Sequence, residues 1–288
     1  MTGPPPNLTQ QWVTQNFPNL TNLAPLSRGG QKLVISAQHP THGSVVLKLI
    51  LPTQDAESLK REILAVRQIN SPRVPKILED GSVPSQFGVC YWLLEQTIPG
   101  ESVRSVVQRG PMAASEVLRL GLHVLQAVVL AEASSIVHRD IKPDNIMRDP
   151  TGAFWLLDFG VSRHLTLDSL TATALPFGKV TWGYSPLEQC RNLKPAIDSR
   201  SDLFALGVTL FECATGNNPF RTGAQDALHM LHRIENQALP ALMLPIQSQE
   251  DFRDLIGAMT QKRRDHRPET AAEALQWIGE ICGREGIQ

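Results

Sequence analysis

HRDIKPDN, at residues 138–145, is the stretch of sequence on which the interpretation of this chain depends. It places an aspartate, a lysine two residues later and an asparagine in one short loop. The triplet DFG at 158–160 follows the apolar segment FWLL, so its aspartate is expected at the end of a strand next to that loop. A lone DFG is common by chance, but the octapeptide followed by DFG at this distance is not.

The residue types in these two segments suit the transfer of a charged group to a hydroxyl. Asn145 and Asp158 offer the oxygen ligands that Mg²⁺ takes together with phosphate oxygens and water. Asp140 is then available to orient a hydroxyl and accept its proton, and Lys142 to neutralise charge on a transferring phosphoryl group. We therefore predict that Asp140 and Lys142 are catalytic and that Asn145 and Asp158 hold a metal ion.

The chain is β-rich before residue 100 and helical after it. Apolar periodicity and turn residues predict strands at 33–51 (with a turn at 40–43), 74–78 and 88–94, and a helix at 54–69. They also predict a hairpin at 145–157 and helices at 112–133, 201–215, 224–236, 249–260 and 271–282. Capping boxes are predicted for Ser199 with Asp202 and for Thr270 with Glu273. The first 25 residues contain five prolines and are interpreted as a lead-in segment.

Lys48 and Glu62 are charged residues in apolar surroundings. Lys48 lies within the strand-like segment SVVLKL, and Glu62 lies on the same helical stripe as Leu59 and Val66. A carboxylate on a buried stripe needs a cation nearby, and Lys48 is the obvious candidate. A structural salt bridge and a functional pair both fit this pattern.

Composition limits the partners and the location of the protein. The 27 Lys and Arg against 28 Asp and Glu give a net charge of −1, which argues against a nucleic-acid-binding surface. Four cysteines without a C-x-x-C pair favour free thiols in a reducing compartment over a zinc site or a redox dithiol. The sequence has no signal-peptide pattern and no run of roughly 18 apolar residues. We predict a cytoplasmic protein without a membrane span.

The motifs together resemble the protein kinase family, from about Leu26 to the last predicted helix. The loop at 138–145 resembles the catalytic loop of that family, and DFG resembles its metal-binding triplet. The segment VVLK resembles the strand that carries the nucleotide-binding lysine, here Lys48, with Glu62 as its partner glutamate. The resemblance implies that Lys48 and Glu62 act together on the α and β phosphates of ATP.

The second half of the chain extends this resemblance. Lys142 is the form that resembles serine/threonine rather than tyrosine kinases. TWGYSPLEQ at 181–189 resembles the end of an activation segment in bacterial-type kinases, and SDLFALGV at 201–208 is similar to the buried helix that anchors the large lobe. Arg267 resembles the arginine that pairs with the glutamate at Glu188.

The resemblance also implies a nucleotide site for ATP with Mg²⁺. By register with the family, its residues are Leu26, Ser27, Gly29, Gly30, Val34, Val46, Lys48, Leu94, Glu95, Thr97, Glu101 and Met147. Leu94 is expected at the back of the adenine pocket, and the main-chain groups of Glu95 and Thr97 at the adenine edge. Glu101 is placed to reach the ribose, with a solvated carboxylate as the alternative.

The glycine-rich loop is the weakest match to the family. The pattern G-x-G-x-x-G-x-V aligns with SRGGQKLV at 27–34, where only Gly29 stays in register and Gly30 is an extra neighbour. Because glycine lets backbone N–H groups approach phosphates closely, this departure puts nucleotide affinity in doubt. A second departure is Leu187, which stands where the family usually has proline.

Regulation is implied by Arg139, which stands beside the catalytic aspartate. An arginine there resembles kinases that are switched by phosphorylation of the activation loop. Thr171 and Thr173 resemble the T-x-T pair that is autophosphorylated in bacterial enzymes, with ordinary polar loop residues as the alternative. Thr181 is predicted to contact Asp140.

These observations predict an α+β, bilobal protein-kinase-like fold. Residues 1–25 form the lead-in, 26–97 a β-rich lobe with one key helix and 98–288 a helical lobe, the two lobes making one kinase domain. The predicted activity is transfer of the ATP γ-phosphoryl group to Ser/Thr hydroxyls of a protein substrate, with autophosphorylation in the activation loop. A regulatory partner or an oligomer is left open.

Two other functions compete with this one. A pseudokinase that binds nucleotide or acts as a scaffold is suggested by the eroded glycine loop. A small-molecule kinase of the antibiotic or choline type shares the aspartate and asparagine core, but such enzymes lack a segment like that at 181–189.

Overall fold

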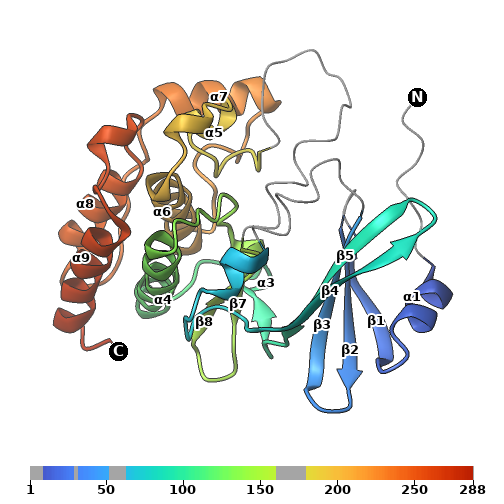
Figure 1. Ribbon diagram of the computed structural model, residues 1–288. Helices are drawn as coiled ribbons and strands as arrows, with labels where there is room; N and C mark the ends of the chain where they lie inside the picture. Colours follow the sequence, from blue (N-terminus) through green and yellow to red (C-terminus); the bar gives the residue numbers. More distant parts are fainter. Residues whose placement is uncertain (1–8, 29–31, 52–62, 160–179, 288) are drawn as a thin grey trace. The chain divides into compact units, whose positions relative to one another are not determined.

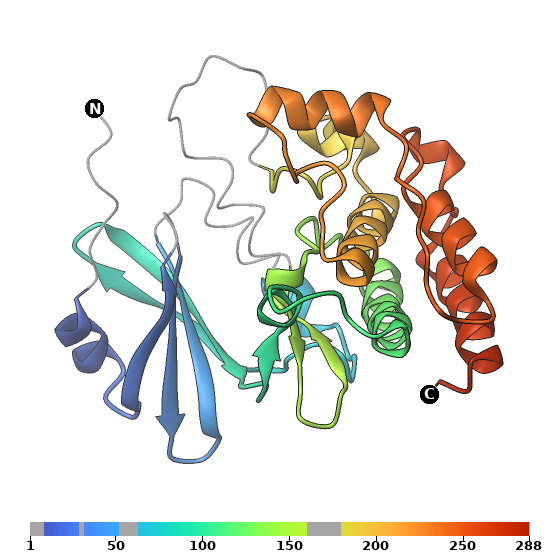
Figure 2. The same ribbon diagram turned by 180° about the vertical axis from the view of Figure 1, so that it is seen from behind.

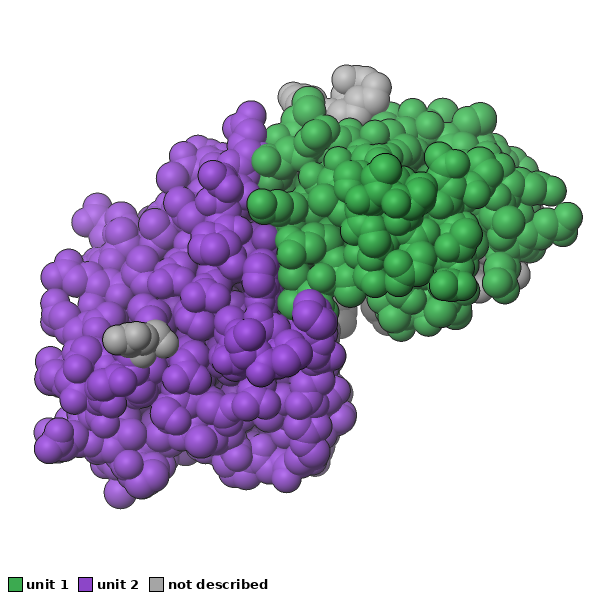
Figure 3. Space-filling view, turned by 90° about the horizontal axis from the view of Figure 1, so that it is seen from below, with its two compact units in different colours: residues 1–67, 75–98, 163–173 green, residues 68–74, 99–162, 174–288 purple. Residues whose placement is uncertain are grey.

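A computed structural model gives the structure of residues 9–28, 32–51, 63–159 and 180–287 (Figure 1). The chain divides into two compact units, which are coloured differently in Figure 3. It passes from the first unit to the second between Ile98 and Pro99, and the segment Gln68–Val74 belongs to the second unit. The first unit holds a five-stranded sheet and the second is mainly helical, which is the predicted α+β class.

An antiparallel sheet with strand order β1-β2-β3-β5-β4 forms the first unit (Figures 1 and 2). Its strands are β1 (Thr21–Arg28), β2 (Lys32–His39), β3 (Gly43–Ile50), β4 (Ile77–Ser85) and β5 (Gly88–Gln96). The hairpin predicted at 33–51 is confirmed as β2 and β3, because the alternating aliphatic residues flank a turn of Pro, Thr and His. Residues 63–67 are helical and belong to the helix predicted at 54–69, most of which lies outside the described residues.

Strand β4 differs from its prediction. The sequence predicts a strand at 74–78, whereas β4 begins at Ile77 and continues to Ser85. It lies at the edge of the sheet and, among the strands of the described residues, pairs with β5 alone, so Pro84 costs no second row of ladder hydrogen bonds there.

Alternation along β3 divides its side chains between the two faces of the sheet. Leu47 and Leu49 are fully buried and share an apolar cluster with Ile35 and Leu94. Because successive side chains of a strand point to opposite faces, Lys48 lies on the other face. One face of this sheet is therefore an apolar core, and the other carries the residues predicted to meet the nucleotide.

The predicted lead-in is wrong for the described residues before 26. Helix α1 (Gln10–Asn16) is capped by Thr9, whose hydroxyl accepts from the N–H of Trp12 at 3.1 Å. Val13 is 1 % exposed and joins the apolar cluster of the sheet, so α1 is part of the folded unit. Pro25 does not prevent a strand from forming here, because it lies in β1, which is an edge strand of the sheet.

Helices packed on one another form most of the second unit. Its helices are α3 (Val103–Val107), α4 (Ala114–Ala133), α5 (Leu187–Cys190), α6 (Ser199–Thr215), α7 (Ala227–Asn236), α8 (Gln249–Met259) and α9 (Ala271–Arg284). A small sheet of β6 (Glu101–Ser102), β7 (Ile146–Arg148) and β8 (Phe154–Leu156) accompanies them, with β7 and β8 as the predicted hairpin. Helix α4 packs against α6 and α9, and α6 packs against α8 (Figures 1 and 2).

Helix α4 is long and apolar enough to cross a membrane by length and composition alone. Its most apolar 18-residue window has a mean hydropathy of 1.4. In the structure its apolar residues are buried against α6, α9 and β8, as in the core helix of a folded domain.

The start of α6 also differs from its prediction. Asp198 is the N-cap, and its carboxylate accepts from the N–H of Arg200 at 3.0 Å. Ser199 instead donates its hydroxyl to Glu132, so the predicted capping box is not formed. The cap predicted for α9 is confirmed, because the hydroxyl of Thr270 accepts from the N–H of Glu273 at 3.2 Å.

A buried ion pair connects α5 to the segment before α9. Arg267 donates from Nη1 to Oε1 of Glu188 at 2.7 Å and from Nη2 to Oε2 at 3.3 Å, as the sequence predicts. The Arg267 side chain is 0 % exposed, and Ser201 on α6 donates to the same carboxylate at 2.8 Å. Three segments distant in sequence are therefore held together at one point.

Loss of this ion pair is expected to destabilise the protein strongly. Arg267→Met leaves the Glu188 carboxylate buried without its cation, so the free energy of unfolding should fall by about 3–5 kcal/mol. Denaturant unfolding of both single variants and of Glu188→Leu/Arg267→Met measures the coupling. The double variant should lose clearly less than the sum of the two singles, and additive losses would contradict the assignment.

A buried histidine on α4 is expected to make stability depend on pH. His123 is 4 % exposed, and its Nδ1 accepts from the N–H of Phe154 at 3.1 Å. Burial, and then the charges of Arg73 and Arg119, lower its pKa to about 4. Between that value and the ordinary pKa of about 6.5, the unfolded chain binds a proton that the folded chain does not.

Stability should therefore fall as the pH is lowered from 6.5 to 4. The contribution of His123 to that loss is up to about 3 kcal/mol. Urea unfolding of His123→Gln, which stays neutral throughout, should give a visibly flatter pH profile than the unmodified chain. Equal slopes in the two proteins would show that His123 is not the titrating group.

Candidate active site

A buried carboxylate holds the backbone of the loop at 138–145. Asp202, on α6, is 1 % exposed, and its two oxygens accept from the N–H groups of His138 and Arg139, each at 2.7 Å. Burial raises the pKa of Asp202, and the two backbone hydrogen bonds from His138 and Arg139 act against the rise. The residue predicted to cap α6 therefore anchors the loop instead.

The imidazole of His138 connects this loop to the DFG segment. Its Nδ1 accepts from the N–H of Asp140 at 3.2 Å, so Nε2 carries the proton and donates to the carbonyl oxygen of Leu157 at 2.7 Å. The ring of Phe159 stands edge-on to it, with centroids 4.6 Å apart. Asp158 thus leaves the end of β8 beside the loop, as the sequence predicts.

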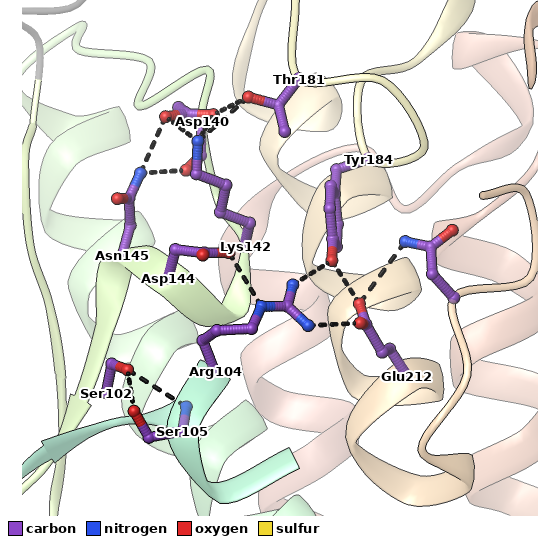
Figure 4. Close-up of polar contacts among 11 residues, drawn as sticks. Ser102, Arg104, Ser105, Asp140, Lys142, Asp144, Asn145, Thr181, Tyr184 and Glu212 are labelled. Atoms are coloured by element: carbon purple, nitrogen blue, oxygen red, sulfur yellow. Dashed lines mark hydrogen bonds and ion pairs between the residues drawn. The ribbon is translucent and has the colours of Figure 1, made fainter. Parts of the chain in front are cut away.

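Three predicted site residues meet around the carboxylate of Asp140 (Figure 4). Lys142 donates from Nζ to both of its oxygens, at 2.9 and 2.8 Å. Asn145 donates from Nδ2 to Oδ2 and to the carbonyl oxygen of Asp140, both at 2.8 Å. The hydroxyl of Thr181 donates to Oδ1 at 2.6 Å and accepts from Lys142 at 3.0 Å. The predicted contact between Thr181 and Asp140 is present.

This arrangement can orient a hydroxyl and take up its proton. The Thr181 hydroxyl already points its hydrogen at Oδ1 of Asp140, with a lysine ammonium beside the same oxygen. A carboxylate in that position accepts a proton when the hydroxyl oxygen attacks an electrophile. The neighbouring ammonium stabilises negative charge that develops near that oxygen.

The donor set of Asn145 and Asp158 fits a hard divalent cation. Both amide hydrogens of Asn145 are donated to Asp140, which turns its oxygen Oδ1 away. Among the described residues, no donor bonds to that oxygen, so it is available as a ligand. An amide oxygen and a carboxylate suit a cation that keeps several waters or phosphate oxygens.

Two site residues adopt the left-handed backbone conformation. Arg139 has φ = 68° and Asp158 has φ = 65°, values that cost energy for residues with a side chain. The bonds from Asp202 hold the first, and the packing of Phe159 holds the second in place. The carbonyl of Arg139 also accepts from Gln189 at 2.6 Å.

A polar network fixes the segment at 181–189 to α6 (Figure 4). Arg104, on α3, donates to Asp144 at 3.2 Å, to Glu212 at 2.7 Å and to the Tyr184 hydroxyl at 2.5 Å. The Tyr184 hydroxyl and the Asn218 amide donate to Glu212 in turn. Burial, and then the charge of Glu212, raise the pKa of Tyr184, so its hydroxyl stays a donor.

In the first unit, one of the nucleotide assignments is wrong. Val34 is the register partner of Lys48, and Val46 is the partner of Glu95, so these four side chains share one face of the sheet. Leu94, predicted at the back of the pocket, lies on the opposite face and is 2 % exposed in the apolar cluster. The register is one residue away from the prediction, and a shift of one residue exchanges the faces.

Three other residues of the first unit were predicted to contact the nucleotide, and for these the structure shows how exposed each side chain is. Leu26 is 59 % exposed and Ser27 is also exposed near the end of β1. Thr97 is half-buried, and its hydroxyl oxygen has no hydrogen-bond partner among the described residues. Their roles remain predictions.

Glu101 is held by an arginine of its own unit. Arg109 donates to both Glu101 oxygens, at 2.6 and 2.7 Å, and this hydrogen bonding lowers the pKa of the carboxyl. Of the two predictions for Glu101, the solvated carboxylate therefore fits the structure better than the contact to the ribose. Met147 lies in β7, where it pairs with Ser102 and Trp155.

Several predicted residues lie outside the described part of the chain. They are Glu62, Gly29, Gly30, Thr171 and Thr173. The regulatory role of Arg139 also stays a prediction.

Three residues make contacts that the sequence did not predict. Arg104 and Glu212 form the centre of the polar network, and Glu95 forms an ion pair with Lys48. The rule that pointed to Glu62 could have found Glu212 and Glu95, because each is a carboxylate within an apolar helix or strand. Arg104 has no such signal, because it lies in the short helix α3, whose five residues are too few to show a buried apolar stripe.

His39, His42 and Glu79 in the first unit have the composition of a metal site. The hydrogen bonds of His39, however, place a proton on the nitrogen that would have to bind the metal. Nε2 of His39 and of His42 lie 3.6 and 3.1 Å from Oε1 of Glu79. Nδ1 of His39 accepts from the N–H groups of Thr41 and His42, both at 3.3 Å, so its proton is on Nε2. That nitrogen therefore donates towards Glu79, whereas a metal ligand would need its lone pair.

Comparison with known proteins adds to this geometry. The protein kinase domain family matches residues 21–277. The chain is 28 % identical to the probable serine/threonine-protein kinase PknB of Lactococcus lactis, over 73 % of this chain and 34 % of the relative. It is also 28 % identical to the serine/threonine-protein kinase PknB of Mycobacterium tuberculosis, over 74 % of this chain and 34 % of the relative.

A third relative is a probable serine/threonine-protein kinase of Corynebacterium efficiens, 30 % identical over 76 % of this chain and 34 % of the relative. The chain thus spans about a third of the length of these curated relatives. The family match includes the loop at 138–145, the DFG segment and the buried pair of Glu188 and Arg267. The chain therefore belongs to the protein kinase domain family.

Proposed function

We propose that this chain is a serine/threonine protein kinase domain that transfers the γ-phosphoryl group of ATP to hydroxyl groups of proteins. The observation that carries the proposal is the Thr181 hydroxyl, which donates to Asp140 at 2.6 Å with Lys142 beside it. A substrate serine or threonine presents the same chemical group. Membership of the family, whose members use ATP, and the names of the relatives support it further.

In the proposed reaction, the substrate hydroxyl oxygen attacks the γ-phosphorus and the bond to ADP breaks. Asp140 orients the hydroxyl and accepts its proton, while Lys142 stabilises charge on the transferring group. Asn145 and Asp158 would hold Mg²⁺, which we propose as the metal because both offer hard oxygen ligands. When bound, Mg²⁺ would neutralise phosphate charge.

The protein substrate would lie against the segment at 181–189. The network of Arg104, Tyr184 and Glu212 holds that segment on α6, and the pair of Glu188 and Arg267 holds its other end. A small-molecule kinase does not need such a segment. Its rigid attachment therefore favours a peptide as the phosphate acceptor.

We propose a cytoplasmic location on chemical grounds. All four cysteines are free and buried, and burial raises the pKa of each thiol. Protonated, inaccessible thiols are typical of proteins that fold in a reducing compartment.

Replacement of Asp140 by asparagine tests the proposed chemistry. Asp140→Asn keeps the shape of the side chain but removes the proton acceptor, so kcat should fall by a factor of about one hundred or more. Transfer of labelled phosphate from ATP with Mg²⁺ to a generic protein substrate measures this. Asp254→Asn, the same change at an exposed position of α8, should leave kcat within about twofold. Full activity of Asp140→Asn would refute the mechanism, and an inactive unmodified chain would favour the pseudokinase.

Autophosphorylation is expected at Thr171 or Thr173. After incubation of the chain with ATP and Mg²⁺, phosphopeptide mapping should find phosphate on one or both. Asp140→Asn treated in the same way should carry none, which controls for a contaminating kinase. An active chain whose segment 160–179 stays unmodified would rule this regulation out.

A further inference from the structure

The lysine predicted to bind ATP is paired with a glutamate of the sheet itself. Nζ of Lys48, on β3, donates to Oε2 of Glu95, on β5. The two side chains are 7 % and 10 % exposed. From the sequence, Glu95 was expected to contribute only its main-chain groups to the adenine edge.

Strand register explains why these two side chains meet. Val46 is the partner of Glu95, and Lys48 is the partner of Leu93. Lys48 and Glu95 are therefore diagonal neighbours on the same face of two adjacent strands, within the reach of long side chains. The pair is set by the β3–β5 ladder and does not require any helix to be in place.

Burial gives this pair a chemical consequence. An amine taken out of water favours its neutral form unless a negative group lies next to it. The carboxylate of Glu95 supplies that charge and fixes the direction of the Lys48 side chain. Because an ammonium has three N–H donors, a bond to Glu95 is compatible with bonds to phosphate oxygens.

We propose that Glu95 is a positioning residue for nucleotide binding, which keeps Lys48 charged and directed towards the phosphates of ATP. This inference rests on the proposed function, in which Lys48 contacts the nucleotide. It adds a second carboxylate, on the sheet, to the partner glutamate expected at Glu62.

The direct test is nucleotide affinity, measured without phosphotransfer. Titration of the full chain with a fluorescent ATP analogue and Mg²⁺ gives Kd for the unmodified protein and its variants. Glu95→Gln removes the charge and should raise Kd about tenfold, the effect of losing one charged hydrogen-bond partner. Glu95→Asp keeps the charge on a shorter side chain and should raise Kd only about threefold. The matched control Glu79→Gln, on β4 of the same sheet, should leave Kd unchanged.

A double-mutant cycle separates positioning from a merely structural role. On the background of Lys48→Met, which has no ammonium to orient, Glu95→Gln should change Kd by less than about twofold. Equal losses on both backgrounds would overturn the proposal, as would an unchanged or lowered Kd for Glu95→Gln alone. If Glu95→Gln does not fold, as judged by thermal unfolding, Glu95→Asp carries the test, and an unchanged Kd overturns it.

These outcomes also distinguish this inference from the proposed function. A chain that binds the analogue, loses affinity in Glu95→Gln and transfers no phosphate would retain the inference and reject the kinase activity. A chain that transfers phosphate with the same KM for ATP in Glu95→Gln would do the reverse. No binding of the analogue by the unmodified chain would overturn both.

Discussion

The carboxylate of Asp202 is the fixed point on which the candidate active site depends. It is buried in α6 and accepts the backbone N–H groups of two consecutive loop residues, His138 and Arg139. That geometry holds Arg139 in a left-handed conformation and sets the direction in which Asp140 leaves the loop. The His138 ring in turn donates from Nε2 to the carbonyl oxygen of Leu157, which connects the loop to the residue that follows β8. A helix core thus positions Asp140 and Lys142, which lie on a loop, in the way that rigid scaffolds generally support catalytic residues.

The motifs in the sequence were sufficient to predict the fold class and the centre of the second unit. The loop at 138–145 and the DFG segment are close in sequence and are joined by a two-stranded hairpin, so their contact follows from local turn chemistry. The contact of Thr181 with Asp140 and the pairing of Glu188 with Arg267 followed from the family resemblance. Both are present. The family match itself covers nearly all of the elements that were predicted.

What the sequence could not supply is mostly register and choice of partner. Leu94 and Glu95 are adjacent, and periodicity alone does not say which of them faces Lys48, because a strand with apolar residues on both faces has no alternation to read. Asp202 matched a capping pattern, and only the fold shows that Asp198 takes the cap and leaves Asp202 for the loop. The network around Glu212 joins segments far apart in the chain, and such contacts leave no local signal in a single sequence.

The docking of α1 on the first sheet bears on where this domain begins. The family match starts at residue 21, yet Val13 and Leu20 are buried in the same cluster as Leu47 and Leu94. A chain cut at the family boundary would leave this part of the sheet uncovered, beside β1, which is an edge strand. Exposed apolar surface next to an open strand edge is a known starting point for self-association. Helix α1 is therefore part of the folded unit, and its removal is expected to expose apolar surface that favours self-association.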